Sequence, residues 1–250
     1  MTEYFTNLIY IFCYDYYRLM HSWNISAAAR ADHHGNIATE PMLTTQVGEV
    51  ITDIFKNRWR TLMSVDDVIA SVIGEVESLG LLSTTYFFYS SDHGFQLGQF
   101  NIPMDKRHVY EWDTKIHLLV RGPGIKPGST MAFPGTQVDI APTFLGLAGL
   151  PATAIMDGRS IVPLLLSSSS DDESLEAAIL PATREHIATV TKRDVAAYRA
   201  TWRTEVFIEY YYCLQNIKCV ETCAATNPYP NADADCGNVS LIYFLFRLII

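Results

Sequence analysis

Apolar residues in the stretch 47–79 recur at the three- and four-residue spacing that is typical of amphipathic helices. The apolar positions of a first predicted helix, which ends near Arg60, are Val47, Val50, Ile51, Ile54 and Phe55. The apolar stripe of a second predicted helix consists of Val65, Val68, Ile69, Val72, Ile73, Val76 and Leu79. Ser64 and Asp67 have the spacing of a capping box, which predicts the start of the second helix, and Gly80 predicts its end. Asp66 and Asp67 would then lie in its first turn, where acids favour the positive end of the helix dipole, and need no metal.

Two continuous apolar runs further along the chain predict buried strands. They cover residues 86–89 and 116–120, and each run stops at a polar or glycine-containing segment. Asp139 is a good N-cap for a third helix over residues 140–147, and residues 161–166 form a short apolar element. Helices and strands therefore alternate, which predicts an α/β domain.

Composition and charge narrow the class of protein. The chain has 250 residues, of which 49% are hydrophobic and 18% charged, and this balance is typical of a globular domain with a sizeable core. A formal net charge of -9 argues against nucleic-acid binding, which needs a basic surface. The apolar segments 1–17 and 241–250 are too short to span a bilayer, so we expect no transmembrane segment. Residues 1–17 carry Glu3 and Asp15 and lack a basic start, so no signal peptide is predicted.

The first predicted strand ends where the candidate chemistry begins. Asp92 and His93 follow it directly, and ligands of α/β sheets bind just beyond the carboxyl ends of strands. The carboxylate of Asp92 suits Ca²⁺ or Mg²⁺, whereas the imidazole of His93 prefers softer metals. Plainer alternatives are that Asp92 caps the following turn and that His93 packs in a loop. Lys106, in the basic loop 105–108, is either an anion-binding ammonium or a solvated surface lysine.

Several segments in this part of the chain carry a family resemblance. They read YSSDHGFQLGQF from Tyr89, PMDKRHVYEWD from Pro103 and LLVRGPGIKPG from Leu118, with RWRTLMSVDD upstream and VDIAPTFLGLAGL and MDGRSIVPLLL downstream. This pattern resembles the sulfatases, most closely their N-acetylglucosamine-6-sulfatase branch, over residues 42–166 almost without interruption. The resemblance implies part of an alkaline-phosphatase-like α/β domain, with a mixed, mostly parallel central sheet flanked by helices.

The same resemblance implies a sulfuric ester hydrolase acting on sulfated glycosaminoglycans of the heparan or keratan sulfate type. Asp92 and His93 would be metal ligands, with Ca²⁺ as the expected cofactor, and Lys106 would contact the sulfate group. His34 stands before a Pro-Met pair, as a family histidine does, and would face the substrate, although an exposed loop histidine is the alternative. The expected location is the lysosome or the extracellular space. Two other interpretations of the sequence remain. The chain is either a non-catalytic remnant that binds sulfated glycans, or a phosphatase or phosphonate hydrolase of the same superfamily.

The largest departure from the family is a missing sequence motif. Sulfatases generate a formylglycine nucleophile from the first residue of a Cys-x-Pro-x-Arg or Ser-x-Pro-x-Arg motif. Neither motif occurs in this sequence. The paired aspartates that supply further metal ligands in the family have no match either. We therefore expect an incomplete catalytic domain, which would be a very poor enzyme by itself.

The predicted organisation has four parts. These are an irregular segment 1–40, the carboxyl part of a sulfatase domain at 41–166, an inserted, partly helical segment 167–200, and the start of a smaller C-terminal region at 201–250. The last part opens with a predicted strand over residues 202–210. It also contains Cys213, Cys219, Cys223 and Cys236, whose spacing favours two disulfides over a zinc site and leaves Cys13 unpaired. Asn24 and Asn238 are glycosylation candidates if the protein is exported.

Overall fold

The structure is a computed structural model that describes residues 26–31, 33, 35–104, 106, 109–166, 173–208 and 248–249. The chain divides into two compact units. Unit 1 comprises residues 1–75, 94–113 and 209–240, and unit 2 comprises residues 76–93, 114–208 and 241–250. His34, Asn24, Asn238 and the five cysteines all lie outside the described residues.

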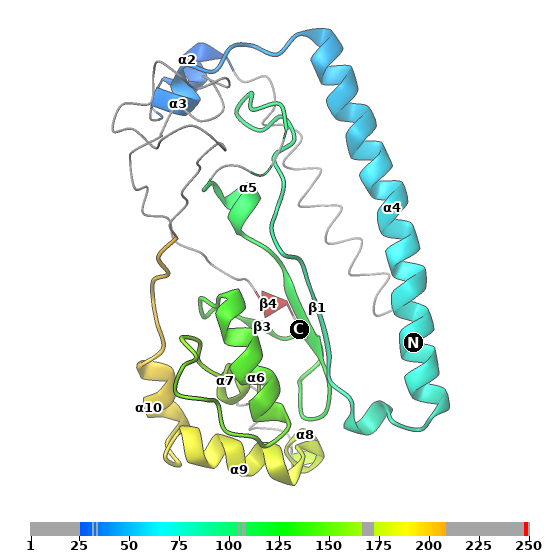
Figure 1. Cartoon of the computed structure of the whole chain (residues 1–250), viewed down its shortest axis with the longest axis vertical. Helices are drawn as coiled ribbons and strands as arrows, with labels where there is room; N and C mark the ends of the chain where they lie inside the picture. The colour runs from blue at the N-terminus through cyan, green and yellow to red at the C-terminus, as the bar shows by residue number, and fades with distance from the viewer. Residues whose placement is uncertain are drawn as a thin grey trace. The chain divides into compact units, whose positions relative to one another are not determined.

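One long helix replaces the two that the apolar pattern predicts. Helix α4, Thr45–Ser78, runs for 34 residues and is drawn in Figure 1 as an unbroken cyan ribbon. The predicted start at Ser64 is wrong, because its hydroxyl donates to the carbonyl of Thr61 at 2.7 Å within the same helix. Residues 49–63, which precede Ser64 in the helix, include no glycine or proline that would interrupt the hydrogen-bonded turns. Asp66 and Asp67 consequently lie in the middle of α4 and not in a first turn.

The predicted end of this helix is confirmed. Gly80 has a φ of +70°, the left-handed conformation that glycine adopts without a Cβ clash. The amide of Leu81 donates to the carbonyl of Val76 at 3.0 Å, and that of Gly80 to Glu77 at 2.9 Å. These bonds satisfy the last carbonyls of α4, as glycine-terminated helices commonly do.

The remaining described elements of unit 1 are short, and two of them are held together by a buried cation. They include helices α2, Ala27–Arg30, and α3, Gly35–Ala38, with most of α5, Glu111–Thr114. Ser26 caps α2 by accepting a hydrogen bond from the amide of Ala29 at 3.2 Å. Arg30 is 2% exposed and donates to the carbonyls of Ile37 and Glu40, so its guanidinium holds α2 and the residues around α3 together.

Unit 2 contains a small mixed sheet in the order β1-β2-β4-β3. The strands are β1 Phe87–Ser90, β2 Leu118–Arg121, β3 Thr130–Met131 and β4 Leu248–Ile249. Both predicted strands are confirmed within two residues. β1 pairs antiparallel with β2, with Phe87 opposite Arg121, whereas β2 and β4 are parallel and β3 and β4 antiparallel. A mostly parallel sheet is therefore not confirmed. The described part of the β1–β2 connection holds only the four-residue α5, and not the longer helical crossover that parallel neighbours need.

Helices cover the core of unit 2. They are α6 Ile140–Leu147, α7 Val162–Leu166, α8 Glu173–Ala178, α9 Pro181–Val190 and α10 Val195–Ala200. The 3₁₀ turn η3, Gln137–Asp139, directly precedes α6, and the 3₁₀ turn η2, Leu82–Thr84, lies between α4 and β1. The predicted bounds of α6 are confirmed, and the apolar element at 161–166 is a helix whose five residues are all buried. The core cluster combines Leu118 and Val120 of β2 with the apolar residues of α7.

The helical part of the predicted insertion packs into this core. Ile179 is 4% exposed, and Thr183 of α9 is fully buried, where its hydroxyl donates to the carbonyl of Leu147 at 2.9 Å. His186 is also buried, with its Nε2 3.0 Å from the hydroxyl of Ser160. Residues 173–190 are therefore part of the packed structure of unit 2. Their status as an insertion relative to the family stays a prediction.

The predicted strand at 202–210 is wrong over the residues that the structure describes there. Residues 202–208 form no strand. Trp202 is 5% exposed, and its indole Nε1 donates to the carbonyl of Pro134 at 2.7 Å. This segment is held through its large side chains and not through a backbone ladder, which explains why its apolar and aromatic composition misled the prediction.

Candidate functional site

The turn after β1 carries the predicted Asp92–His93 pair. Ser90, the last residue of β1, donates its hydroxyl to the carbonyl of His117 at 2.8 Å, which ties the end of β1 to the entrance of β2. Ser91 closes the turn by donating its hydroxyl to the carbonyl of His93 at 2.8 Å. Residues 91–93 therefore form a local hydrogen-bonded turn at the carboxyl end of a strand, as the sequence predicts.

Within this turn the acid and the imidazole lie against each other. Asp92 Oδ1 accepts the backbone N–H of His93 at 3.0 Å, and Asp92 Oδ2 lies 3.1 Å from His93 Nε2. The side chain of Asp92 is 80% exposed and that of His93 33% exposed. Loss of hydration is the largest single influence on the pKa of Asp92 and acts to raise it. Three influences act in the opposite direction: the charge of the His93 imidazole, hydrogen bonds from the backbone amides of Asp92 and His93, and a hydrogen bond from the Ser91 side chain. Together they outweigh the loss of hydration and lower the pKa of Asp92 below its ordinary value.

The described residues do not make a complete calcium site. Calcium takes six to eight oxygen ligands, whereas this turn offers the one carboxylate of Asp92 and a nitrogen ligand, His93. Oδ1 of that carboxylate already accepts hydrogen bonds from the turn itself. Throughout the described part of the chain, no group of three or more His, Cys, Asp and Glu side chains could hold a metal ion. The expected Ca²⁺ thus does not fit these residues by themselves.

Lys106, the predicted sulfate-binding residue, is exposed and belongs to unit 1. Its neighbours Asp105, Arg107 and His108 lie outside the described residues, as does the substrate candidate His34. Asp92 and His93 belong to unit 2, so their proximity to Lys106 stays a prediction.

A glycine follows the pair for a steric reason. The amide of Gly94 donates to the carbonyl of Asp113 at 2.7 Å, and the amide of Phe95 to the carbonyl of Trp112 at the same distance. A Cβ on Gly94 would overlap with the Trp112 carbonyl oxygen. The glycine of the Asp-His-Gly motif, Gly94, is therefore needed because its backbone closely approaches that of Trp112.

Sequence reasoning missed Gln137, which contacts the candidate turn directly. Its side-chain Nε2 donates to the carbonyl oxygens of Ser91 at 2.8 Å and Asp92 at 2.9 Å, from 46 and 45 residues away in the chain. Gln137 is the first residue of η3, just before α6. No periodicity or charge pattern marks such a residue. The one sequence feature that could have pointed to Gln137 is its position two residues before Asp139, the predicted N-cap of the helix at 140–147.

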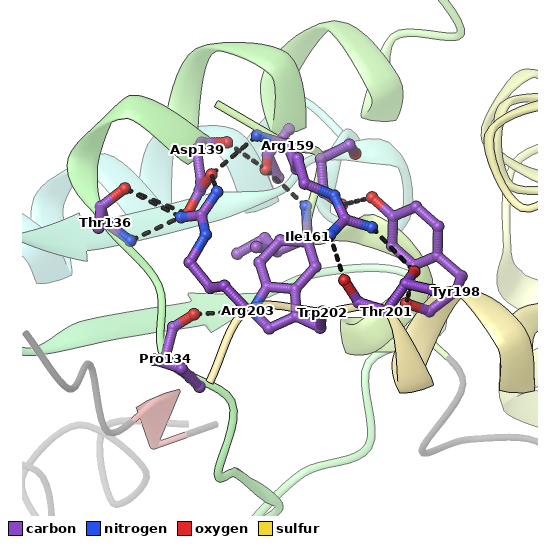
Figure 2. A network of polar contacts seen from close by, with 11 residues as sticks. Pro134, Thr136, Asp139, Arg159, Ile161, Tyr198, Thr201, Trp202 and Arg203 are labelled. Carbon is purple, nitrogen blue, oxygen red and sulfur yellow. Dashed lines mark hydrogen bonds and ion pairs between the residues drawn. The ribbon is translucent and has the colours of Figure 1, made fainter. Parts of the chain in front are cut away.

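Asp139 anchors the same short turn. It is 2% exposed, and its carboxylate pairs with both terminal nitrogens of Arg203, Nη1 to Oδ2 at 2.5 Å and Nη2 to Oδ1 at 2.9 Å (Figure 2). Oδ2 also accepts the amide of Thr136 at 2.9 Å, and Oδ1 accepts the amide of Arg159 at 2.8 Å. Asp139 occupies the N-cap position of α6 as predicted, but its side chain does not cap that helix and serves this network instead.

Two guanidinium groups flank the indole of Trp202. Arg159 lies 4.8 Å from the ring centroids of Tyr198 and Trp202, and Arg203 lies 5.1 Å from that of Trp202 (Figure 2). Arg159 also donates from Nη1 to the carbonyl of Thr201 at 2.7 Å. Charge, hydrogen bonds and aromatic faces together seat residues 198–203 against the turn that carries Asp139.

Comparison with known proteins identifies the class. The sulfatase family model matches residues 12–150, more than half of the chain, so the chain belongs to the sulfatase family. It is 32% identical over 222 residues to the N-acetylglucosamine-6-sulfatase of Homo sapiens, an alignment that covers 83% of this chain and 35% of the relative. It is 44% identical over 130 residues to an extracellular sulfatase of Drosophila melanogaster, covering 52% of this chain and 12% of the relative. The predicted resemblance to N-acetylglucosamine-6-sulfatases is confirmed.

A solved structure of a protein in complex with its substrate D-glucosamine-2-N,6-O-disulfate is also similar, at 29% identity and a TM-score of 0.43. That match covers 61% of this chain and 25% of the other. The chain thus spans about a third of the length of the human relative and a quarter of this structure. In the described part of the chain, no helix combines the length and the apolar character needed to cross a membrane.

Proposed function

We propose that this chain is the part of a sulfuric ester hydrolase that contributes Asp92, His93 and Lys106 to the site. Its substrate would be a 6-sulfated glucosamine unit in a glycan of the heparan or keratan sulfate type. The observation that carries the proposal is the 32% identity to N-acetylglucosamine-6-sulfatase over 83% of the chain.

The chemistry of sulfate-ester cleavage explains the proposed roles. Negative charge on the sulfate oxygens must be stabilised as the ester bond breaks, and fixed cations do this best. The ammonium of Lys106 would contact those oxygens as a point charge, and His34 would face the sugar. Asp92 and His93 would be ligands of a divalent cation, which we expect to be Ca²⁺ and which needs more oxygen ligands than these residues supply.

A second candidate function is binding of sulfated glycans without turnover. The specific observation in its favour is that neither the Cys-x-Pro-x-Arg nor the Ser-x-Pro-x-Arg motif occurs in the 250 residues. The sequence therefore does not supply the nucleophile that sulfatases use. The Asp92–His93 turn and Lys106 would then serve recognition of a sulfated sugar alone.

Two assays on the purified chain distinguish these candidates. The first measures hydrolysis of an aryl sulfate and of a 6-sulfated glucosamine disaccharide, with a phosphate ester for comparison. The second measures binding of a heparan sulfate oligosaccharide by titration calorimetry, with Lys106→Ala as the variant and Lys126→Ala as the matched control, since both lysines are exposed.

Sulfate release that Asp92→Asn abolishes would support the hydrolase. Binding that Lys106→Ala weakens, without sulfate release, would support the second candidate. Hydrolysis of the phosphate ester alone would select a phosphatase of the same superfamily. Neither binding nor turnover would contradict all three.

We further propose export to the lysosome or the extracellular space, supported by relatives named N-acetylglucosamine-6-sulfatase and extracellular sulfatase. Asn24 and Asn238 would then be glycosylated, because each lies in an Asn-x-Ser sequon. Glycosidase treatment of the protein from secretory cells should increase its electrophoretic mobility, and loss of this shift in the double Asn→Gln variant would assign the sites. An unchanged mobility of the original protein would contradict glycosylation.

A further inference from the structure

The candidate carboxylate is exposed, yet the backbone that carries it is held from outside its own turn. The side chain of Asp92 is 80% exposed, so little packing restrains it. Its local restraints are the His93 amide and the Ser91 hydroxyl, which contact Oδ1 at 3.0 Å and 3.3 Å. All of these groups belong to the same three-residue turn, which is tied at its two ends through Ser90 and Gly94.

Gln137 supplies an external restraint on the turn itself. One Nε2 carries two N–H donors, and in this structure it reaches the carbonyls of two successive residues, Ser91 and Asp92, at 2.8 Å and 2.9 Å. The Ser91 carbonyl belongs to the peptide group before the Asp92 Cα, and the Asp92 carbonyl belongs to the peptide group after it. The two bonds therefore restrain both planes that meet at this Cα, and these planes set the direction of the Asp92 Cα–Cβ bond.

The position of Gln137 is fixed in turn by the buried carboxylate two residues away. Asp139 closes η3 by accepting the Thr136 amide, and its bidentate pair with Arg203 holds that turn in place. Charge-assisted bidentate pairs are the most directional hydrogen bonds that side chains make. Arg203 is itself held over the indole of Trp202, which is buried (Figure 2). The restraint therefore runs from the core of unit 2 to an exposed turn.

We propose that Gln137 is a positioning residue, which sets the direction of the Asp92 carboxylate through the Ser91 and Asp92 carbonyls, and that the Asp139–Arg203 pair fixes Gln137 for this task. The use of the carboxylate as a cation ligand rests on the proposed function. The positioning itself does not depend on it.

The test compares three variants of the full chain. Gln137→Met keeps the length of the side chain but removes both donors, whereas Gln137→Lys restores donors at a similar reach. Val138→Ala changes the neighbouring residue of η3, whose side chain is 54% exposed, and is the matched control.

The first measurement is hydrogen exchange of the His93 backbone amide by NMR, because this amide donates to Asp92 Oδ1. Exchange should be roughly tenfold faster in Gln137→Met, since two hydrogen bonds are lost, and close to the original rate in Gln137→Lys and Val138→Ala. The melting temperature should remain within a few degrees in all three, because Gln137 is exposed. An unchanged His93 exchange rate in Gln137→Met, or a loss of protection throughout unit 2, would overturn the inference.

The second measurement is binding of Ca²⁺ alone by titration calorimetry. Asp92 and His93 supply too few oxygen ligands for tight binding, so the original chain should bind Ca²⁺ weakly. A misdirected Asp92 should weaken this binding by roughly a further tenfold in Gln137→Met and leave it unchanged in Val138→Ala, an effect that a merely structural role would not produce at constant melting temperature. If the original chain binds no Ca²⁺, the calcium part of the proposed function fails, and the exchange measurement still decides the positioning role. Ca²⁺ affinity that stays constant in Gln137→Met would contradict the functional use of the restraint.

Discussion

Helix α4 and the segment around Asp139 are stabilised in opposite ways. Of the 34 residues in α4, all of them described, only Gly48 and Ile51 are buried. Several of its side chains bond to carbonyls three or four residues earlier in the helix, such as the Ser71 hydroxyl to the Asp67 carbonyl at 2.8 Å. Asp139 lies in a short turn yet bonds to Arg203, 64 residues away. The comparison teaches that regular structure here comes from nearby residues, whereas the position of the candidate turn depends on distant ones.

The largest expected effect tests this difference with ion pairs. Arg203→Ala should lower the free energy of unfolding by about 3–5 kcal/mol, because it leaves the carboxylate of Asp139 buried without its cation. Lys56→Ala removes the exposed pair with Asp53 on α4, where the two side chains are 57% and 75% exposed, and should cost about 0.5 kcal/mol or less. Urea denaturation followed by circular dichroism measures both. Equal effects of the two variants would remove the distinction between the regions.

The next effect concerns close packing. Gly146 of α6 faces His186, and a Cβ there would overlap with the imidazole Nε2. Gly146→Ala should therefore cost about 1–3 kcal/mol by displacing His186 from the hydroxyl of Ser160. Thermal unfolding gives the change in stability, and loss of the His186–Ser160 contact should appear in the NMR shifts of the ring. A neutral substitution would show that α6 and α9 can separate at little cost.

A third prediction concerns pH and the buried carboxyl of Glu40. Burial raises its pKa to about 7, against the opposing charge of Arg30. The folded chain therefore keeps a proton that the unfolded chain releases above its ordinary pKa of 4.5, and stability falls as pH rises from about 4.5 to about 7. One such proton contributes a slope of at most about 1.4 kcal/mol per pH unit. Glu40→Gln should flatten this part of the pH profile of stability.

The matched control for Glu40→Gln is Glu49→Gln, because Glu49 is exposed on α4. Its profile should stay parallel to that of the original chain. If Glu40→Gln leaves the slope between pH 4.5 and 7 unchanged as well, the carboxyl does not titrate in the way its burial implies.

The smallest expected effect is a gain of stability on α4. Gly74 lies inside the helix, and a Cβ there would meet nothing within 4 Å. Gly74→Ala should raise stability by about 0.5–1 kcal/mol, because alanine loses less backbone entropy in a helix. Gly80→Ala is the contrasting variant, since its φ of +70° penalises a Cβ and should cost about 1 kcal/mol. Differential scanning calorimetry measures both. A gain in both variants would show that α4 continues past Ser78.

Sequence reasoning was accurate where a signal is local. The apolar period and the glycine at its end predicted the end of α4, and Asp139 marked the start of α6 within a residue. It failed at Ser64, because a serine hydroxyl can bond to the preceding turn as readily as it caps a new one. It also failed at residues 202–208, whose aromatic composition suits a strand or a packed loop equally well. Gln137 and Arg203 contact partners 45 to 67 residues away, and no spacing rule connects such positions.

The burial of Trp202 between two guanidinium groups gives unit 2 an optical reporter. Its indole is 5% exposed and flanked by Arg159 and Arg203, whereas Trp59 and Trp112 belong to unit 1. A chain in which Trp202 is the sole tryptophan should emit at short wavelength when folded and shift to the red as the Asp139–Arg203 pair opens. Fluorescence could then follow the opening of the Asp139–Arg203 pair in real time, separately from the melting of helix α4.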